Sequence, residues 1–481
     1  MWSGPGCFGS MFIFIFSKME GDRPVKQMKL VLAIFIALAM AAPALAFNAE
    51  WHGDFNHRAS YSTQGDWSKR TSKDNKSYFG IDGYTNADSV PSPKKNKDDA
   101  DMFAEVKYRT HLVVSDDEKK VKAVLGLEIG SEKFGSGAAV NGGDKTGEIE
   151  LRWAYTDIQL PFDPASRVSV GLQPVGYNML LWSDNAAGVK WTRAEGAWKY
   201  SLGWWRTDWD DINSGAGNSD SSENGEIYSA DATYKFDNGA VNAFAHFRNQ
   251  GDDQFVGRTY LADGTVDDPG VTVTRDSTLW LGLSGNASWG DLSAMGTAIY
   301  QTGEVKTDSA TDDLDRQSYL LHAQADYKVD KTTYTLGGLF TPGDDNDSDG
   351  DLDNFDHIDI STSVLGSVII FDNYADDNSF SQATYVFDKG YKIIYGGVAH
   401  KLNAKTKVWG KYFWHNTEED IAGEDEIGHE FVAGVSYTIM KGLTADINAG
   451  YLIAGDLLDE LVTGDDADDI FRTDARLRFK F

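Results

Sequence analysis

Apolar and polar residues alternate with a period of two along most of this chain. From Phe47 to Tyr61 the odd positions are mainly apolar or aromatic, and the even positions are mainly polar. Because neighbouring side chains of a strand point to opposite faces, this pattern predicts a strand between an apolar and a watery environment, whereas a helix would mix both kinds on every face. The chain is therefore predicted to be all-β.

The alternation recurs in about 18 segments of roughly 9 to 13 residues each. In residues 102–112 the apolar side chains occupy even positions, and in residues 121–129, 149–155, 443–453 and 471–481 they occupy odd positions. The segments lie near 47–62, 101–114, 120–131, 148–160, 167–174, 188–195, 197–208, 226–236, 240–249, 278–289, 291–302, 316–328, 331–341, 391–402, 405–416, 427–439, 442–454 and 470–481.

The connections between these segments alternate between short and long. Short ones such as 237–239 and 289–291 are followed by long ones rich in Asp, Gly and Ser, of which 342–390 is the longest. Two apolar rows, Tyr228 to Phe236 and Tyr319 to Tyr327, have rings at both ends and small or aliphatic residues between them, like the girdles of a membrane barrel. We predict a transmembrane antiparallel β-barrel of about 18 strands, with 16 as the alternative. Its periplasmic turns would be short and its extracellular loops long and acidic. A soluble β-sandwich also alternates, but it gives no reason for the pattern of turn lengths.

Composition excludes two other classes of protein. The chain has 74 acidic and 44 basic residues, a net charge of −30 and a mean hydropathy of −0.40. This charge argues against binding to nucleic acid, and the hydropathy argues against a helical membrane protein.

The first 46 residues are predicted to lie outside the fold. Met28 and Lys29 precede an apolar run from Leu30 to Ala42, and the small residues up to Ala46 form a cleavage site, so this segment is predicted to be a Sec signal peptide. Met28 is then the predicted start, and an uncleaved anchor is the alternative. The single barrel domain would comprise residues 47–481. The only cysteine, Cys7, would be lost with the signal peptide, which excludes thiol chemistry from the mature protein.

The chain ends in an alternating strand with a terminal aromatic residue. Leu477, Phe479 and Phe481 share one parity, and here the chain resembles the bacterial outer-membrane porins, whose last strand carries such a signal for the barrel-assembly machinery. Residues 171–173, with 184–189 after a short gap, also resemble the region around the constriction loop of trimeric general-diffusion porins. The resemblance implies a homotrimer in the outer membrane, in contact with lipid and lipopolysaccharide, that acts as a passive channel and requires no cofactor.

The polar parity of the first five strands and of the last strand is rich in cations. Because the last strand must pair with the first to close a barrel, we expect these cations to form one basic wall of the pore. The wall consists of Arg58, Lys107, Arg109, Lys122, Arg152, Arg167, Arg472, Arg476 and Arg478. The porin resemblance implies acids on an inward-folded loop opposite such a wall, and the candidate is Pro174 to Ala187 with Asp184. The other interpretation is that each cation only pairs with a neighbouring carboxylate. Acidic outer loops would attract cations, so the two effects oppose each other.

One acidic loop has the spacing of a calcium site. It has acids at positions one, three, five, seven, nine and twelve and a glycine at position six, and it resembles loops of the EF-hand or thrombospondin-repeat kind. Carboxylates at alternate positions can surround Ca²⁺, but the short aspartate at position twelve makes bidentate ligation harder. A solvated acidic loop is the alternative. The six predicted ligands are Asp345, Asp347, Asp349, Asp351, Asp353 and Asp356.

Motifs of common enzyme classes are missing from the sequence. His429-Glu430 lacks the second histidine of a zincin, and no nucleophile elbow, P-loop or dinucleotide fingerprint occurs. We therefore predict a porin rather than an enzyme. Two rivals remain open, a barrel sheath around a multihaem cytochrome that conducts electrons and a secreted all-β carbohydrate-active enzyme.

Overall fold

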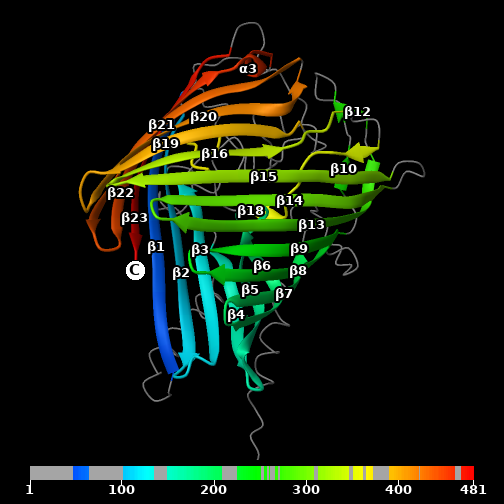
Figure 1. Cartoon of the computed structure of the whole chain (residues 1–481), viewed down its shortest axis with the longest axis vertical. Helices are drawn as coiled ribbons and strands as arrows, with labels where there is room; N and C mark the ends of the chain where they lie inside the picture. Colours follow the sequence, from blue (N-terminus) through cyan, green and yellow to red (C-terminus); the bar gives the residue numbers. More distant parts are fainter. Residues whose placement is uncertain are drawn as a thin grey trace, which may run out of the picture.

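Eighteen long antiparallel strands form one closed β-barrel (Figure 1). The computed structural model describes residues 47–63, 101–134, 149–207, 225–250, 254–256, 259–260, 266–268, 271–307, 313–345, 350–360, 365–371, 389–421, 423–460 and 467–481. The predicted signal peptide and the predicted start at Met28 lie outside these ranges. No helix within them has the length and apolarity that a membrane span requires.

Each wall strand pairs with its neighbours in sequence order, except where short loop strands intervene. The wall strands are β1 (Phe47–Ser62), β2 (Asp101–Asp116), β3 (Val121–Lys133), β4 (Ile149–Leu160), β5 (Asp163–Asn178), β6 (Trp182–Glu195), β7 (Trp198–Thr207), β8 (Gly225–Phe236), β9 (Gly239–Gln250), β13 (Val271–Trp289), β14 (Leu292–Thr307), β15 (Leu314–Val329), β16 (Thr332–Thr341), β19 (Tyr391–Lys401), β20 (Thr406–Ile421), β21 (Glu424–Met440), β22 (Leu443–Ala454) and β23 (Ile470–Lys480). The short elements are β10 (Gln254–Val256), β11 (Thr259–Tyr260), β12 (Val266–Asp268), β17 (Asp351–Leu352), β18 (Asp359–Ile360) and helix α3 (Asp456–Glu460).

The barrel closes where the first strand meets the last. β1 and β23 pair antiparallel, from Asp54 opposite Lys480 to Ser62 opposite Arg472. Beyond this ladder the backbones of Gly53 and Phe481 exchange two hydrogen bonds of 3.1 Å. A Cβ atom on Gly53 would overlap the Phe481 ring, so the glycine makes room for the terminal aromatic residue. Closure leaves neither β1 nor β23 with a free edge along this seam, and the count of 18 strands rather than 16 is confirmed.

Short turns gather at one rim of the barrel. Eight connections at this rim, from 117–120 to 441–442, contain only two or four residues. At the opposite rim the wall-strand connections are longer or enter the interior, apart from the two-residue connection between β20 and β21. Gly196 and Gly290, each in a two-residue turn, have φ angles of 60° and 62°, which glycine adopts without steric cost. Both chain ends of the barrel, Phe47 and Phe481, are at this short-turn rim.

The apolar parity faces outward. Tyr319 and Tyr327 at the two ends of one β15 row are 41% and 51% exposed, while Leu320 between them in sequence is fully buried. Tyr228, Tyr234 and Phe236 on β8 are also exposed. The predicted girdles therefore lie on the outer surface, and a soluble sandwich, which would bury these rings between two sheets, is excluded.

One predicted face is wrong because β4 contains a bulge. Gly126 pairs with Trp153 and Leu127 with Leu151, so Arg152 has no partner in the ladder. The extra residue reverses the alternation, as bulges do. Trp153 and Tyr155 consequently point inward rather than to lipid, and the Trp153 ring centroid lies 5.0 Å from that of His111.

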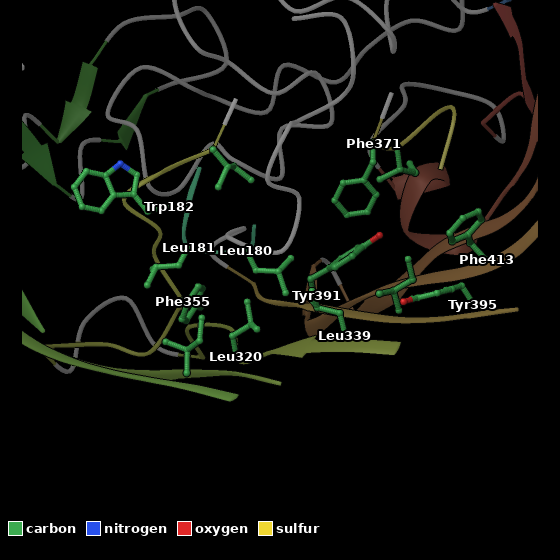
Figure 2. Close-up of a cluster of buried hydrophobic side chains, with 14 of the residues drawn as sticks. Leu180, Leu181, Trp182, Leu320, Leu339, Phe355, Phe371, Tyr391, Tyr395 and Phe413 are labelled. Atoms are coloured by element: carbon green, nitrogen blue, oxygen red, sulfur yellow. The ribbon is translucent and has the colours of Figure 1, made fainter. Parts of the chain in front are cut away.

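The predicted outer loop 342–390 does not stay outside. Its described parts fold into the barrel, where β17 pairs with β15 and β18 pairs with β6. Phe355 and the run Val368 to Phe371 are 0–1% exposed and pack in one apolar cluster with residues of the wall (Figure 2). The physical reason is the apolar character of these short stretches inside a polar segment.

Candidate functional site

All nine predicted wall cations project into the barrel. They share the inward parity of β1, β2, β3, β5 and β23, and Arg152 joins them through the bulge in β4. The pairing of β1 with β23 places Arg58 opposite Arg476 and Asn56 opposite Arg478. The cations therefore form one continuous surface, which we call the basic wall.

Every cation of the basic wall has a carboxylate partner. Glu128 receives three of them, with Lys107 at 2.9 Å, Arg109 at 2.7 Å and Arg152 in contact as well. Asp157 contacts Arg167 and, at 3.7 Å, Lys122. The remaining pairs are Arg58 with Glu105 at 2.7 Å, Arg472 with Asp474 at 3.3 Å, Arg476 with Asp446 at 3.0 Å and Arg478 with Asp54 at 2.8 Å.

Solvent reaches only part of this wall. The side chains of Lys122, Arg478, Arg167 and Arg109 are 26–39% exposed, whereas those of Arg58 and Arg472 are 1% exposed. The carboxylates hold the exposed guanidinium groups in fixed orientations, as charge-assisted hydrogen bonds do. These four side chains are thus the most accessible cations of the wall to a passing solute.

The predicted constriction segment, Pro174 to Ala187, is a hairpin rather than a loop. β5 pairs with β4 only up to Leu172, and β6 pairs with β7 only from Ala187 onward, so the hairpin tip leaves the wall. Gly171 and Gly188 face each other at the bend. Gly171 has a φ of 122°, and a Cβ there would lie 2.2 Å from the Ala154 carbonyl oxygen, so the bend requires glycine.

The hairpin tip enters the interior and packs against β7, β8 and β14. Asn178 Nδ2 lies 3.5 Å from Thr297 Oγ1 on β14, and the hydroxyls of Tyr177 and Ser229 on β8 are 2.9 Å apart. The Trp182 ring packs edge-on against Trp205 at 5.5 Å. The tip therefore narrows the lumen from within.

Asp184 lies at the base of this hairpin. It pairs with Val175 in the β5–β6 ladder and accepts a 3.0 Å hydrogen bond from the Asn185 side chain. Asn185 in turn accepts a hydrogen bond from Trp153 of the bulged strand. Asp184 is thus a strand residue beside the basic wall, and its part in solute selection stays a prediction.

The predicted calcium loop divides into two parts in the structure. Asp347 and Asp349 lie outside the described residues, while Asp345, Asp351 and Asp353 lie on the stretch that enters the barrel. Gly350 has a φ of 89°, as the predicted sharp turn requires. Within the described ranges, no three acidic, histidine or cysteine side chains are arranged to hold a metal ion.

The structure places Asp356 in an ion cluster rather than at the end of a metal loop. Its carboxylate lies 2.6 Å from Arg248 and 3.4 Å from Arg316, and both arginines also contact Asp276. Burial disfavours ionisation, but these guanidinium groups hold the pKa of Asp356 well below its usual range. With two cations as partners, Asp356 anchors the inward segment.

Backbone contacts strengthen this anchor. The Asp356 amide donates to the side-chain oxygen of Gln301 at 2.8 Å, and the indole of Trp280 donates to the Asp356 carbonyl at 3.0 Å. The Arg248 guanidinium lies 5.0 Å from the centre of the Trp280 ring. Residue 356 is therefore tied to β9, β13, β14 and β15 together.

A second anchor, at Glu430, was not predicted from the sequence. This fully buried carboxylate of β21 accepts hydrogen bonds from the Ser367 hydroxyl at 2.6 Å and from the amides of Val368 and Ile369 at 2.8 and 2.9 Å. His415 Nε2 lies 3.2 Å from the same carboxylate. The sequence contained only a weak signal, the apolar run 368–371 inside a polar segment.

The two anchors hold an apolar half of the interior against strands β7 to β22. Figure 2 shows Leu180, Leu181 and Trp182 of the hairpin gathered with Phe355 and Phe371 of the inward segments and with wall residues such as Leu320 and Tyr391. We call this packed region the apolar plug. It leaves the partly exposed basic wall as the polar side of the lumen.

Several solved structures of other proteins have a similar fold. The outer membrane protein opdK from Pseudomonas aeruginosa matches with a TM-score of 0.50 at 10% identity, over 90% of this chain and 98% of that chain. A BenF-like porin from Pseudomonas fluorescens Pf-5 gives 0.53 at 11% identity, and OccK9 (OpdG) from Pseudomonas aeruginosa gives 0.52 at 12% identity, both with the same coverage. The chain has the fold of the outer-membrane porins. No protein-family model and no curated protein matches this chain in sequence.

Localisation follows from the porin fold and the outer surface together. A closed barrel with exposed tyrosine, tryptophan and leucine side chains is stable only where lipid covers them, and strands cross a bilayer only in closed barrels. The barrel is therefore a protein of the bacterial outer membrane.

Proposed function

We propose that this porin is a passive channel for ions and small hydrophilic solutes, and that their path runs between the basic wall and the apolar plug. The observation that carries the proposal is the division of the lumen. One side holds exposed cations at Lys122, Arg109, Arg167 and Arg478, and the other is filled by anchored apolar segments.

The test is a single-channel recording on the purified full chain in planar bilayers. Steady conductance with a reversal potential in a salt gradient supports the channel and gives the sign of its selectivity. Absence of any conductance from folded, heat-modifiable protein would contradict it.

A solute-specific channel is the close variant of this proposal. Two inward segments narrow the lumen, and this favours selection by size and charge over wide, general diffusion. A panel of small organic acids, sugars and amines in a liposome-swelling assay separates the two variants. Uniform rates that depend only on solute size would favour general diffusion.

The electron-conduit alternative receives less support. A barrel that sheathes a cytochrome needs an open interior, but here the chain's own hairpin and inward segments occupy much of the described interior. Co-purification of a haem protein would restore that alternative. A carbohydrate-active enzyme on a soluble all-β fold does not fit a barrel with an apolar outer surface, and the absence of enzymatic activity stays a prediction.

The partners implied by the porin resemblance remain part of the proposal. We expect a homotrimer, which chemical cross-linking in native membranes tests. We also expect Leu477, Phe479 and Phe481 to serve as the signal for the barrel-assembly machinery, since all three face outward at the last strand. Replacing Phe481 with serine would then lower the yield of assembled barrel.

Calcium binding by the acidic loop also remains a proposal, now without Asp356 among its ligands. It is supported by the spacing of Asp345 to Asp353 and the positive φ of Gly350. Calorimetry with Ca²⁺ at millimolar concentration tests it, with the double variant Asp351→Asn and Asp353→Asn as the comparison. Absence of Ca²⁺ binding heat from the unmodified protein would contradict calcium binding by this loop.

A further inference from the structure

Four aligned positions at the short-turn end of the lumen carry three aromatic rings. His52 on β1 is the register partner of His111 on β2, and the row continues through Gly126 on β3 to Trp153 on β4. The two imidazole centroids are 4.8 Å apart with an interplanar angle of 26°, and Trp153 meets the His111 ring edge-on at 5.0 Å. His52 and His111 are the only two histidines that face each other in register in the described strands, and they belong to neither the basic wall nor the apolar plug.

Both imidazoles point into the lumen. His52 shares the inward parity of Asp54, and His111 shares that of Arg109. The pair lies just beyond the seam between β1 and β23, on the side of the short turns. The His52 side chain is 44% exposed, and His111 is partly exposed as well. An ion that enters the lumen from the short-turn side can therefore reach both rings.

The ring nitrogens of this pair have no hydrogen-bond partner in the described part of the chain, and none of the four is enclosed. Other histidines of the barrel each have such a partner: His322 bonds Tyr395, and His429 bonds Tyr412. Polar groups that stabilise a fold are normally satisfied in this way. The nitrogens of His52 and His111 face water instead and are available to a ligand.

The spacing of the two rings fits a single metal ion. A Zn²⁺–N bond of about 2.1 Å places the ion roughly 3.2 Å from the centroid of an imidazole ring. Two rings on one ion then have centroids about 4.5 Å apart for a right angle at the metal and about 5.2 Å apart for a tetrahedral angle. The observed 4.8 Å lies between these values. Rotation of the rings, without movement of the strands, therefore suffices to aim two nitrogens at one ion.

The chemistry of the ligands selects the class of ion. Imidazole nitrogen suits Zn²⁺, Ni²⁺ and Cu²⁺, whereas Ca²⁺ and Mg²⁺ prefer oxygen. One carboxylate oxygen of Glu50 lies 3.7 Å from His52 Nε2, and the other lies 3.5 Å from Lys119, so Glu50 contributes negative charge beside the ion. The described residues hold no third ligand in position, and water would complete the shell. The neighbouring cation Arg109 is paired with Glu128, which weakens its repulsion of a metal ion.

We propose that His52 and His111 together bind one divalent transition-metal ion of the Zn²⁺, Ni²⁺ and Cu²⁺ class at the short-turn mouth of the lumen. The bound ion adds two positive charges beside the basic wall and occupies part of the solute path. Binding of the ion depends on the two rings alone. Its effect on conductance rests on the proposed channel function, so the two are measured separately.

Calorimetry with Zn²⁺ on the purified full-length barrel tests the site. The titration is done in millimolar Ca²⁺, which occupies any oxygen site in the acidic loop, and Mg²⁺ replaces Zn²⁺ in a parallel run. His52→Asn and His111→Asn each remove one ligand. His57→Asn, on the exposed outer face of β1, is the matched control. All variants are compared as folded, heat-modifiable protein.

We expect the unmodified barrel and His57→Asn to bind one Zn²⁺ per chain with the same affinity. Each ligand variant should bind Zn²⁺ at least about tenfold more weakly, because one of the two metal–nitrogen bonds is lost. Mg²⁺ should not bind at this pair. Absence of Zn²⁺ binding would overturn the proposal. Equal binding by all variants would also overturn it, since the ion would then lie elsewhere, for instance at the exposed pair of His429 and Glu426.

Conductance in planar bilayers gives a second readout. Zn²⁺ added on the short-turn side should lower the conductance of the unmodified barrel and of His57→Asn, but not that of His52→Asn. An equal decrease in His52→Asn would mean that the ion blocks at another position and would contradict the proposal. If no protein conducts while Zn²⁺ binding still depends on the two histidines, the channel is refuted and the metal site is supported.

Discussion

The basic wall and the apolar plug are both built from the inward parity of the same barrel, yet their chemistry is opposite. On β1, β2 and β23 the inward side chains are mostly polar and include many Arg, Lys, Asp and Glu, whereas on β7, β13, β16 and β19 they include Trp205, Trp280, Leu339 and Tyr391, all 0–3% exposed. An inward face is polar only where water covers it. Where the chain's own segments cover it, the inward face becomes a hydrophobic core.

The largest expected effect comes from detaching the plug. Glu430→Gln exchanges a buried carboxylate oxygen for a donor that faces the amides of Val368 and Ile369, and breaking such a buried network costs about 3 kcal/mol. We expect residues 365–371 to leave the wall and single-channel conductance to rise several-fold. Glu226→Gln, a partly exposed carboxylate on β8, is the control. Unchanged conductance in a folded Glu430→Gln barrel would mean that the plug is held without this anchor.

The hairpin bend should be the next most sensitive point. Gly171→Ala places a Cβ 2.2 Å from the Ala154 carbonyl oxygen at a φ of 122°, and we expect a loss of about 2–3 kcal/mol or a displaced hairpin. Gly196→Ala has a φ of 60° but no atom within 4 Å of the added Cβ, so it should cost only about 1 kcal/mol. Urea unfolding in detergent compares the two, and equal losses would show that crowding at the bend is unimportant.

Charge removal from the basic wall should have a smaller effect. Arg478→Gln leaves Asp54 without its closest cation, and Arg167→Gln does the same to Asp157. We expect the reversal potential in a salt gradient to move toward cation selectivity, with barrel stability nearly unchanged. Arg193→Gln removes a cation from the outer face at the short-turn rim and should leave the reversal potential unchanged. A shift of the same size in Arg193→Gln would assign selectivity to the rim.

The smallest effect is expected from mild acid. Because the pKa of Asp356 is lowered below its ordinary 3.8, its ion pairs with Arg248 and Arg316 contribute fully above about pH 4 and are lost only as the pH falls further through the lowered value. Conductance should therefore stay constant between about pH 7 and pH 5 as far as this anchor is concerned. Asp356→Asn should abolish the acid transition below pH 4. Release of the apolar plug between pH 7 and pH 5 in the unmodified protein would mean that a group other than Asp356 controls it.

The sequence predicted the wall better than the interior. Alternation over nine or more residues sufficed to place Tyr319, Tyr327 and the nine cations on the correct faces, because register follows from a period that covers the whole strand. The bulge at Arg152 could not be predicted, since one extra residue in the ladder leaves no distinctive side chain. The Asp356 and Glu430 anchors were missed because each joins parts of the chain more than 60 residues apart.

The contact between Gly53 and Phe481 makes the barrel sensitive to its own length. The seam needs the final residues of the chain, so a product that stops a few residues early exposes unpaired amides of β1 and β22 to lipid. Such a product cannot be rescued by the intact strands, because an open sheet has no stable place in a bilayer. The ladder around Gly53 and Phe481 is therefore a point at which the loss of a few residues would open the whole barrel.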